Sequence, residues 1–248
     1  PPAAAFACLA CLTPLFLGFL FPVSVLLRWA WMTRHLFQPA GMVARVGASL
    51  TLAIGTSLLL TVLAVLTVYA CRLNPSRRLD HLNRLALLGY AIPGAVIAVG
   101  VMVTIAFFSR WLPLHGTIHV IGFAYLVRFF AVPVQPIKAS MTRVCGGLDE
   151  ASRSLGHPPA QTLFRINLPL IRGTLFSATM LVFVDILKEL PLTMILRPPE
   201  FDTLATFTFS LAGEVGRIHE CAIPSLLIIL LAAIGLMGLN RLIRPNLP

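Results

Sequence analysis

The chain has 248 residues, of which 58% are hydrophobic and 11% charged, and its mean hydropathy is +0.89. Soluble domains carry about 25% charged residues, so this composition excludes an ordinary soluble protein and indicates an all-α, polytopic membrane protein. The net charge of +10 does not indicate nucleic-acid binding, because the basic residues are scattered near the ends of apolar stretches and do not gather into a patch with interleaved aromatic residues.

Six apolar stretches predict six transmembrane helices, since about 20 apolar residues cross a bilayer. In chain order these stretches are residues 3–31, 47–71, 85–108, 117–136, 173–196 and 222–239. The first is overlong, and we expect Pro14 and Pro22 to kink it. It begins without a basic segment, so it does not resemble a cleaved signal peptide. We expect residues 1–248 to form a single membrane domain.

Small side chains recur every four residues in two of the predicted spans. Gly47, Thr51 and Gly55 lie on one face of the second span, and Gly94 and Ala98 lie on one face of the third. Such faces let another helix approach closely, so we interpret them as packing surfaces.

Lysine and arginine residues predict the orientation of the chain. With six spans, the side that holds both termini and the loops after the second and fourth spans carries the larger number of them. Cytoplasmic loops of membrane proteins are enriched in these residues, so we expect the loop after the fourth span to be cytoplasmic.

That loop is long and polar, and seven of its residues form a spaced pattern: Glu150, Ala151, Ser152, Gly156, Ile166, Leu168 and Pro169. Residues 150–155 favour a short helix that Gly156 can end, because glycine adopts a left-handed backbone at little cost. Pro158 and Pro159 suit the start of a second helix. The sequence therefore predicts a helix-turn-helix outside the membrane, which is the geometry of a docking element.

The pattern Glu-Ala-Ser-x3-Gly-x9-Ile-x-Leu-Pro resembles the signature loop of the permeases of binding-protein-dependent ABC importers. Ser152 departs from the family pattern, which usually has a second alanine there. The resemblance implies a permease domain in the bacterial inner membrane whose cytoplasmic coupling loop, residues 138–169, docks onto a dimer of ATP-binding subunits. It also implies two further partners, a second permease half that is fused or separate and a periplasmic substrate-binding protein.

Charged residues interrupt the fifth predicted span. Asp185, Lys188 and Glu189 lie at i, i+3 and i+4, hence on one helical face, and Pro191 is expected to break the helix just beyond them. Charges inside a membrane are costly unless they are paired or hydrated. They either form an intramembrane ion pair, with Arg128 of the fourth span as a further partner, or line the translocation path. We expect Glu189 to line the path and Asp185 to pair with Lys188.

Residues 182–206 and 125–129 are similar to permeases of ferric iron ABC importers. Those permeases are typically two fused six-span halves with one signature loop each, so this chain resembles the C-terminal half. Permeases for thiamine or phosphonate share much of the architecture and remain alternatives. A different class, an ion-coupled secondary transporter, would use Asp185, Glu189 and Arg128 as a proton or ion relay.

The sequence predicts no catalytic residue and no cofactor. Cys8 and Cys11 have Cys-x-x-Cys spacing, but they lie in an apolar span where a thiolate is poorly solvated, and the histidines show no metal-ligand spacing. The phosphate-binding pattern Gly-x4-Gly-Lys-Ser/Thr does not occur in the sequence. If ATP drives this protein, another chain binds and hydrolyses it. Whether residues of this chain contact a metal substrate stays open.

Overall fold

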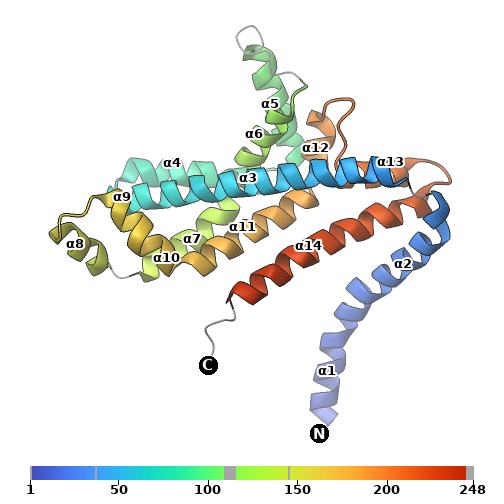
Figure 1. The fold of residues 1–248 in the computed structure, drawn as a ribbon, viewed down its shortest axis with the longest axis horizontal. Coiled ribbons are helices and arrows are strands. Elements are labelled where there is room, and N and C mark those ends of the chain that lie inside the picture. The colour runs from blue at the N-terminus through green and yellow to red at the C-terminus, as the bar shows by residue number, and fades with distance from the viewer. Residues whose placement is uncertain (1, 37, 109–115, 145, 244–248) are drawn as a thin grey trace. The chain divides into compact units, whose positions relative to one another are not determined.

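The fold comes from a computed structural model that describes residues 2–36, 38–108, 116–144 and 146–243. Within these ranges every regular element is a helix, which confirms the all-α prediction (Figure 1). The chain divides into two compact units, one of Pro1–Ala48 with Asp202–Leu231 and one of Ser49–Phe201 with Ala232–Pro248. The prediction of a single domain stays a prediction.

Two predicted spans are single long helices. The second span lies within α3 (Pro39–Leu73), and the sixth lies within α14 (Ala222–Ile243). Both helices are long enough to cross a hydrocarbon layer of about 30 Å at about 1.5 Å per residue. These two predictions are confirmed, and both helices extend beyond the predicted bounds.

The first unit contains the first span and one helix that the sequence analysis missed. Its elements are α1 (Pro2–Leu15), the π-helical η1 (Phe16–Leu20), α2 (Phe21–Thr33), the 3-10 turns η2 (Arg34–Leu36) and η5 (Ile218–Cys221), and α13 (Leu204–Gly213). The two predicted kink positions flank the π-helical η1. The missed helix α13 starts with a capping box, in which Thr203 and Thr206 exchange side-chain-to-backbone hydrogen bonds of 3.3 and 2.9 Å.

The third predicted span, residues 85–108, is not one straight helix. It covers the end of α4 (Arg77–Leu87), the 3-10 turn η3 (Leu88–Ala91) and α5 (Gly94–Phe108), and the chain bends by more than 40° between η3 and α5. Pro93 explains the break, because a residue before proline avoids helical backbone and Ile92 is extended at φ −82° and ψ 135°.

The fourth and fifth spans also differ from prediction at their ends. The fourth consists of α6 (Ile118–Phe129) and α7 (Ala131–Arg143), which meet at 46°, so it continues past its predicted end at residue 136. The fifth helix, α11 (Arg172–Leu187), ends before its predicted limit, and Pro191 starts a separate helix α12 (Pro191–Leu196). A proline ring clashes with the carbonyl four residues earlier, which accounts for a bend near Phe129 ahead of Pro133 and for the end at Leu187.

Among the described residues, three helices can cross a membrane by length and composition, and up to six crossings result if each bent pair counts as one. The bent pairs are Arg77–Ala91 with Gly94–Phe108, Ile118–Phe129 with Ala131–Arg143, and Pro159–Leu170 with Arg172–Leu187. The six-span prediction agrees with the upper figure.

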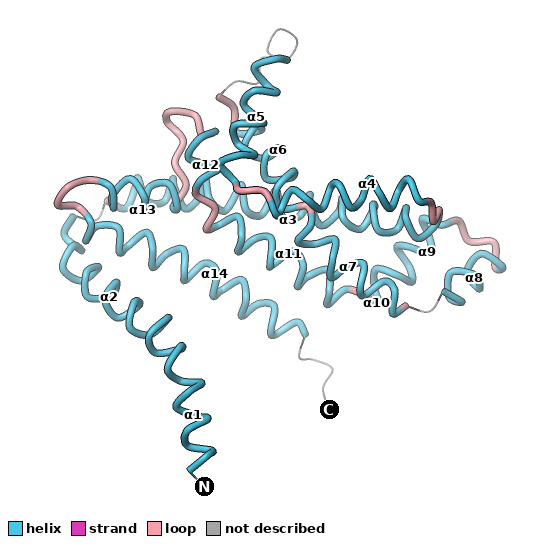
Figure 2. Tube along the Cα trace, turned by 180° about the vertical axis from the view of Figure 1, so that it is seen from behind, coloured by secondary structure: helices cyan, strands magenta, loops and turns pink. Residues whose placement is uncertain are grey.

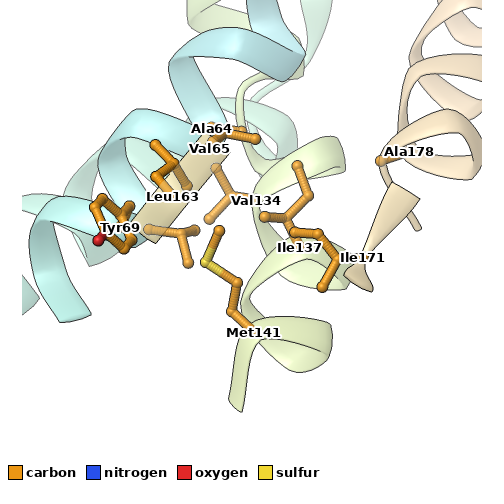
Figure 3. Close-up of a cluster of buried hydrophobic side chains, with 10 residues drawn as sticks. Ala64, Val65, Tyr69, Val134, Ile137, Met141, Leu163, Ile171 and Ala178 are labelled. Atoms are coloured by element: carbon orange, nitrogen blue, oxygen red, sulfur yellow. The ribbon is translucent and has the colours of Figure 1, made fainter. Parts of the chain in front are cut away.

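The core of the second unit gathers α3, α7, α11 and the segment between α7 and α11. Ten buried side chains form it: Ala64, Val65, Val68, Tyr69, Val134, Ile137, Met141, Leu163, Ile171 and Ala178 (Figure 3). Leu163 and Ile171 belong to or border the predicted coupling loop, whereas Ala64 and Val65 belong to α3. The loop therefore shares one core with a membrane-spanning helix.

Gly89 provides a test of the packing between η3 and α6. A Cβ at Gly89 would overlap the backbone carbonyl oxygen of Val127, which cannot move as a flexible side chain can. We expect Gly89→Ala to lower the free energy of unfolding by about 1–3 kcal/mol, as overpacking does. The melting temperature of the purified protein in detergent measures this loss. Gly100→Ala is the control, because nothing lies within 4 Å of its Cβ position; an equal loss in both variants would contradict this packing.

Candidate functional site

The first helix of the predicted coupling loop is α8 (Gly146–Ser154), and Gly156 ends it as predicted. Gly156 has φ +79°. The Gly156 N–H donates to the Arg153 carbonyl at 2.9 Å, and the His157 N–H donates to the Ser152 carbonyl at 3.1 Å. These two bonds form a Schellman motif, which requires a left-handed residue at this position. The turn is therefore fixed by backbone geometry that glycine suits best.

The second helix also begins where the sequence predicts. It consists of α9 (Pro159–Thr162), the π-helical η4 (Leu163–Asn167) and α10 (Leu168–Leu170), with Pro158 as the N-cap. It continues into α11 after a bend of 79° at Ile171. The first residues of the predicted coupling loop, 138–143, belong to α7, which extends to Arg143. Figure 2 shows α8, α9 and α10 together at one end of the second unit.

Ser152 lies inside the helix-turn-helix and not on its surface. Its side chain is buried, and its hydroxyl oxygen lies 2.7 Å from that of Thr162, which is also buried. This bond joins α8 to α9 across the turn. The departure from the family pattern is thus matched by a polar partner ten residues later, so the hydroxyl does not lack a hydrogen bond.

The other pattern residues face outward or lie partly buried. Glu150, Ala151, Gly156 and Pro169 are exposed, whereas Ile166 and Leu168 are intermediate. Two large apolar side chains of the same segment are also exposed, Leu155 at 76% and Phe164 at 67%. The segment therefore leaves two large apolar side chains uncovered by the described part of the chain.

Arg72 at the end of α3 holds this segment in place. Its Nε lies 2.7 Å from Asp149 Oδ2, and its two other nitrogens donate to the carbonyl oxygens of Met141 and Val144. Asp149 Oδ1 in turn accepts a 3.2 Å hydrogen bond from Asn167, whose side chain is fully buried. One guanidinium therefore connects α3, the end of α7 and α8, and through Asp149 it reaches η4.

A second contact from α3 supports the start of α9. The Tyr69 hydroxyl donates to the Pro159 carbonyl at 2.7 Å. A cavity of about 120 Å³ lies beside this contact, and Tyr69, Arg72, Asp149, Arg153 and Thr162 help to line it. Both helices of the helix-turn-helix are thus bonded to α3.

The sequence analysis missed Tyr69, Arg72, Asp149 and Asn167. Arg72 lies in the loop after the second predicted span, and the sequence analysis used the basic residues of that loop only to predict orientation. Asp149 and Asn167 lie directly beside pattern residues, at positions that the pattern leaves open. The sequence does not reveal that Arg72 meets Asp149 or that Asp149 meets Asn167, because these residues are far apart in the chain and only the fold brings them together. The signal in the sequence was the position of Asp149, a charged residue directly before the first residue of the pattern.

The structure brings Arg128 of α6 together with Glu189, which lies between α11 and α12. Arg128 Nε lies 3.5 Å from Glu189 Oε2, and the Glu189 side chain is 7% exposed. Glu189 Oε1 also accepts the Leu192 N–H at 3.2 Å in the first turn of α12. Gly94 makes room for the pair, because a Cβ there would overlap the Arg128 guanidinium and lie 2.9 Å from Glu189 Oε1. The packing surface predicted at Gly94 is therefore packed against an ion pair.

Asp185 and Lys188 form a separate pair. Lys188 Nζ lies 2.9 Å from Asp185 Oδ1, and the lysine side chain is 65% exposed. The four charges predicted on the fourth and fifth spans thus form two pairs, one largely buried and one in which the lysine is exposed. These contacts favour the ion-pair interpretation, and a path-lining role for Glu189 stays a prediction.

We predict that Arg72→Gln destabilises the protein by about 3 kcal/mol, because it breaks a largely buried ion pair and leaves the Asp149 carboxylate uncompensated. Melting temperatures in detergent check the loss, and a double-mutant cycle with Asp149→Asn should give a coupling energy of about 0.5–3 kcal/mol. Arg165→Gln is the matched control, since Arg165 is an exposed arginine of the same segment. Additive effects of Arg72→Gln and Asp149→Asn would contradict the network.

We predict that Glu189→Gln costs more stability than Asp185→Asn. The first leaves the Arg128 charge buried without a counter-charge, at about 3–5 kcal/mol, whereas the second removes a pair with an exposed partner worth about 0–1 kcal/mol. Thermal unfolding in detergent compares the two. Glu189→Gln with an unchanged melting temperature would show that the carboxylate is hydrated, as in a path, and would exclude the structural pair.

The comparisons with known proteins agree on one family. Residues 61–247 match the family model described as "Binding-protein-dependent transport system inner membrane component". PhnV of Salmonella typhimurium, named as a 2-aminoethylphosphonate transport system permease, is 27% identical over 195 residues, which cover 79% of this chain and 72% of that protein. The Fe(3+)-transport system permease FbpB 2 of Haemophilus influenzae is 26% identical over 189 residues, which cover 75% of this chain and 37% of that protein.

Solved structures show the same fold. A chain of the bacterial alginate ABC transporter, crystallised with a periplasmic protein that binds alginate pentasaccharide, has a TM-score of 0.77 and 17% identity and covers 97% of this chain and 94% of its own. A chain of the inward-facing MetNI methionine ABC transporter has a TM-score of 0.65 and 15% identity. The match covers 86% of this chain and 100% of the MetNI chain. The family match covers most of the chain, its signature loop folds as a helix-turn-helix, and we conclude that the chain belongs to the binding-protein-dependent inner membrane components, the permease subunits of ABC importers.

Proposed function

We propose that the segment from α8 to α10 is the cytoplasmic docking element of this permease and transmits the movement of a partner ATPase dimer to the membrane helices. The observation that carries this proposal is the division of the segment into two faces. Glu150, Leu155 and Phe164 are exposed and available to a partner. Ser152, Thr162 and Asn167 are buried and bonded within the protein.

The face of the segment that is bonded within the protein makes it suitable for transmitting movement to the membrane helices. Arg72 and Tyr69 tie it to α3, and Leu163 and Ile171 pack in the same core as Val134 of α7. A packed core responds to a push by moving as a unit, because it cannot deform continuously. Closure of the ATPase pair would therefore move α3, α7 and α11 together and switch the path between outward and inward openings. The chain itself performs no covalent chemistry in this mechanism.

Ferric iron, delivered by a periplasmic binding protein, is the substrate that we propose first. Residues 182–206 and 125–129 resemble permeases of ferric iron importers, and the relative from Haemophilus influenzae is named for Fe(3+) transport. A small phosphonate is the second candidate, because the Salmonella relatives are named for 2-aminoethylphosphonate transport and align over more of their own length. In both cases a second permease half, fused or separate, would complete the path.

Uptake into proteoliposomes tests the function and the substrate together. The complete importer, with its ATPase and binding protein, is supplied with radiolabelled ferric iron or radiolabelled 2-aminoethylphosphonate. We expect uptake of one substrate that requires both ATP and the binding protein. Uptake driven by a proton gradient without ATP would overturn the ATP-coupled mechanism and would favour the secondary transporter.

We predict that Gly156→Asp abolishes ATP-driven uptake and leaves the protein folded in the membrane. The left-handed backbone at Gly156 costs about 1–2 kcal/mol for a residue with a Cβ, which the domain can tolerate. There is room for the side chain, since nothing lies within 4 Å, so the carboxylate projects from the docking face. Expression level, uptake and binding-protein-stimulated ATP hydrolysis are measured in parallel.

Gly147→Asp is the matched control for this variant. It adds the same charge to the first turn of the same helix, also with nothing within 4 Å and without a positive φ. A carboxylate near a helix N-terminus is tolerated or mildly favourable. We expect this variant to retain uptake. Normal uptake by Gly156→Asp would exclude the turn as the coupling element.

A further inference from the structure

The first compact unit contains a cavity that the transport mechanism does not use. Its volume is about 230 Å³. It lies where the end of α2, the start of α3, α13 and η5 meet, and its polar lining includes Thr33, Gln38, Arg45, Arg217 and Glu220. The cavity therefore combines a size suitable for a small molecule with several charged groups.

Arg45 is the central group of this cavity. Its guanidinium carbon lies 3.7 Å from the centre of the Phe207 ring, so the ring covers one face of the guanidinium. Gly41 leaves room beside it, because a Cβ there would lie 2.9 Å from Arg45 Nη1. Two neighbours thus position the guanidinium without neutralising it. Among the described residues no carboxylate pairs with Arg45, and its Nε is buried without a hydrogen-bond partner.

The other arginine of the cavity is already neutralised. Arg217 donates to both oxygens of Glu220 at 3.0 and 2.8 Å and also pairs with Glu214. The hydrogen bonds to Glu220 and Glu214 raise the pKa of Arg217 above its usual value, so this group keeps its charge and its partners. Arg45 is therefore the arginine of the cavity lining that has no ion-pair partner among the described residues.

We propose that this cavity binds a small oxyanion of the phosphate or phosphonate class, with the Arg45 guanidinium as the main ligand. A guanidinium with one face on an aromatic ring presents its edge, and that edge donates two parallel N–H bonds to an oxyanion. The Gln38 carboxamide lines the same cavity and supplies a further N–H donor. The anion is either free in solution or the phosphate of a lipid headgroup, since both present the same oxygens. Binding at this site does not depend on the proposed transport function and is measurable without an ATPase or a binding protein.

Calorimetric titration of the purified full chain tests the site. The protein is placed in nanodiscs of phosphatidylcholine only and titrated with inorganic phosphate and with methylphosphonate. We expect saturable binding that weakens about tenfold or more in Arg45→Gln, because a charge-assisted bidentate contact is lost. Gly41→Ala should weaken binding as well, since its methyl group displaces the flexible guanidinium but keeps the charge.

Arg34→Gln is the matched control for this experiment. Arg34 also lies over an aromatic ring, 3.9 Å from the centre of Trp31, in the same unit, but it is exposed and does not line the cavity. We expect the Arg34→Gln variant to bind the two anions with the same affinity as the unmodified chain. An equal loss in Arg34→Gln and Arg45→Gln, equal binding by Arg45→Gln and the unmodified chain, or no saturable binding by any of them in any of the discs would overturn the proposal.

A second series identifies the source of the anion. Discs with increasing phosphatidylglycerol are titrated with the same two anions. Competition by the lipid that disappears in Arg45→Gln identifies a headgroup as the occupant. An unchanged affinity for the free anions identifies a soluble occupant. Both results support the oxyanion site, whereas lipid competition that persists in Arg45→Gln would place anion binding elsewhere and contradict it.

Discussion

One guanidinium at the end of α3 holds the proposed docking element, the segment from α8 to α10. Arg72 binds the Asp149 carboxylate of α8 and two backbone carbonyls at the end of α7, so a single side chain of α3 satisfies groups from two other elements. Only arginine has enough donors in a fixed planar arrangement to do this, since a lysine ammonium would act as a point charge on one or two of these acceptors. The carbonyls at a helix end would otherwise lack partners, so the same contact also completes α7.

The consequence is a loop that behaves as part of the membrane domain. Its inner face is bonded through Asp149, Asn167 and the Ser152–Thr162 contact, and Leu163 belongs to the core shared with α3. Its outer face keeps Leu155 and Phe164 exposed. A partner that binds the outer face would act on a rigid body, which is the requirement for mechanical coupling over a distance. The proposed docking role rests on this division.

The ion pair between Arg128 and Glu189 is organised around a helix break. Arg128 belongs to α6 and Glu189 lies between α11 and α12, and the carboxylate also accepts the Leu192 N–H at the start of α12. The break before Pro191 leaves backbone donors without helical partners, and a buried carboxylate is an efficient acceptor for them. Gly94 is small because a guanidinium occupies the space that a side chain would need. The ion pair, the helix break and the glycine therefore form one structural unit between α5, α6 and α12.

The sequence by itself determined the features that depend on local chemistry. Apolar length predicted the membrane helices, Gly156 predicted the end of α8, and Pro159 predicted the start of α9, because helix length, positive φ and a missing N–H are properties of single residues or short segments. Tertiary structure decided which distant residues meet. Neither the pairing of Arg72 with Asp149 nor the cavity around Arg45 has a local signal, since these contacts join residues far apart in sequence and exist only after the helices have packed.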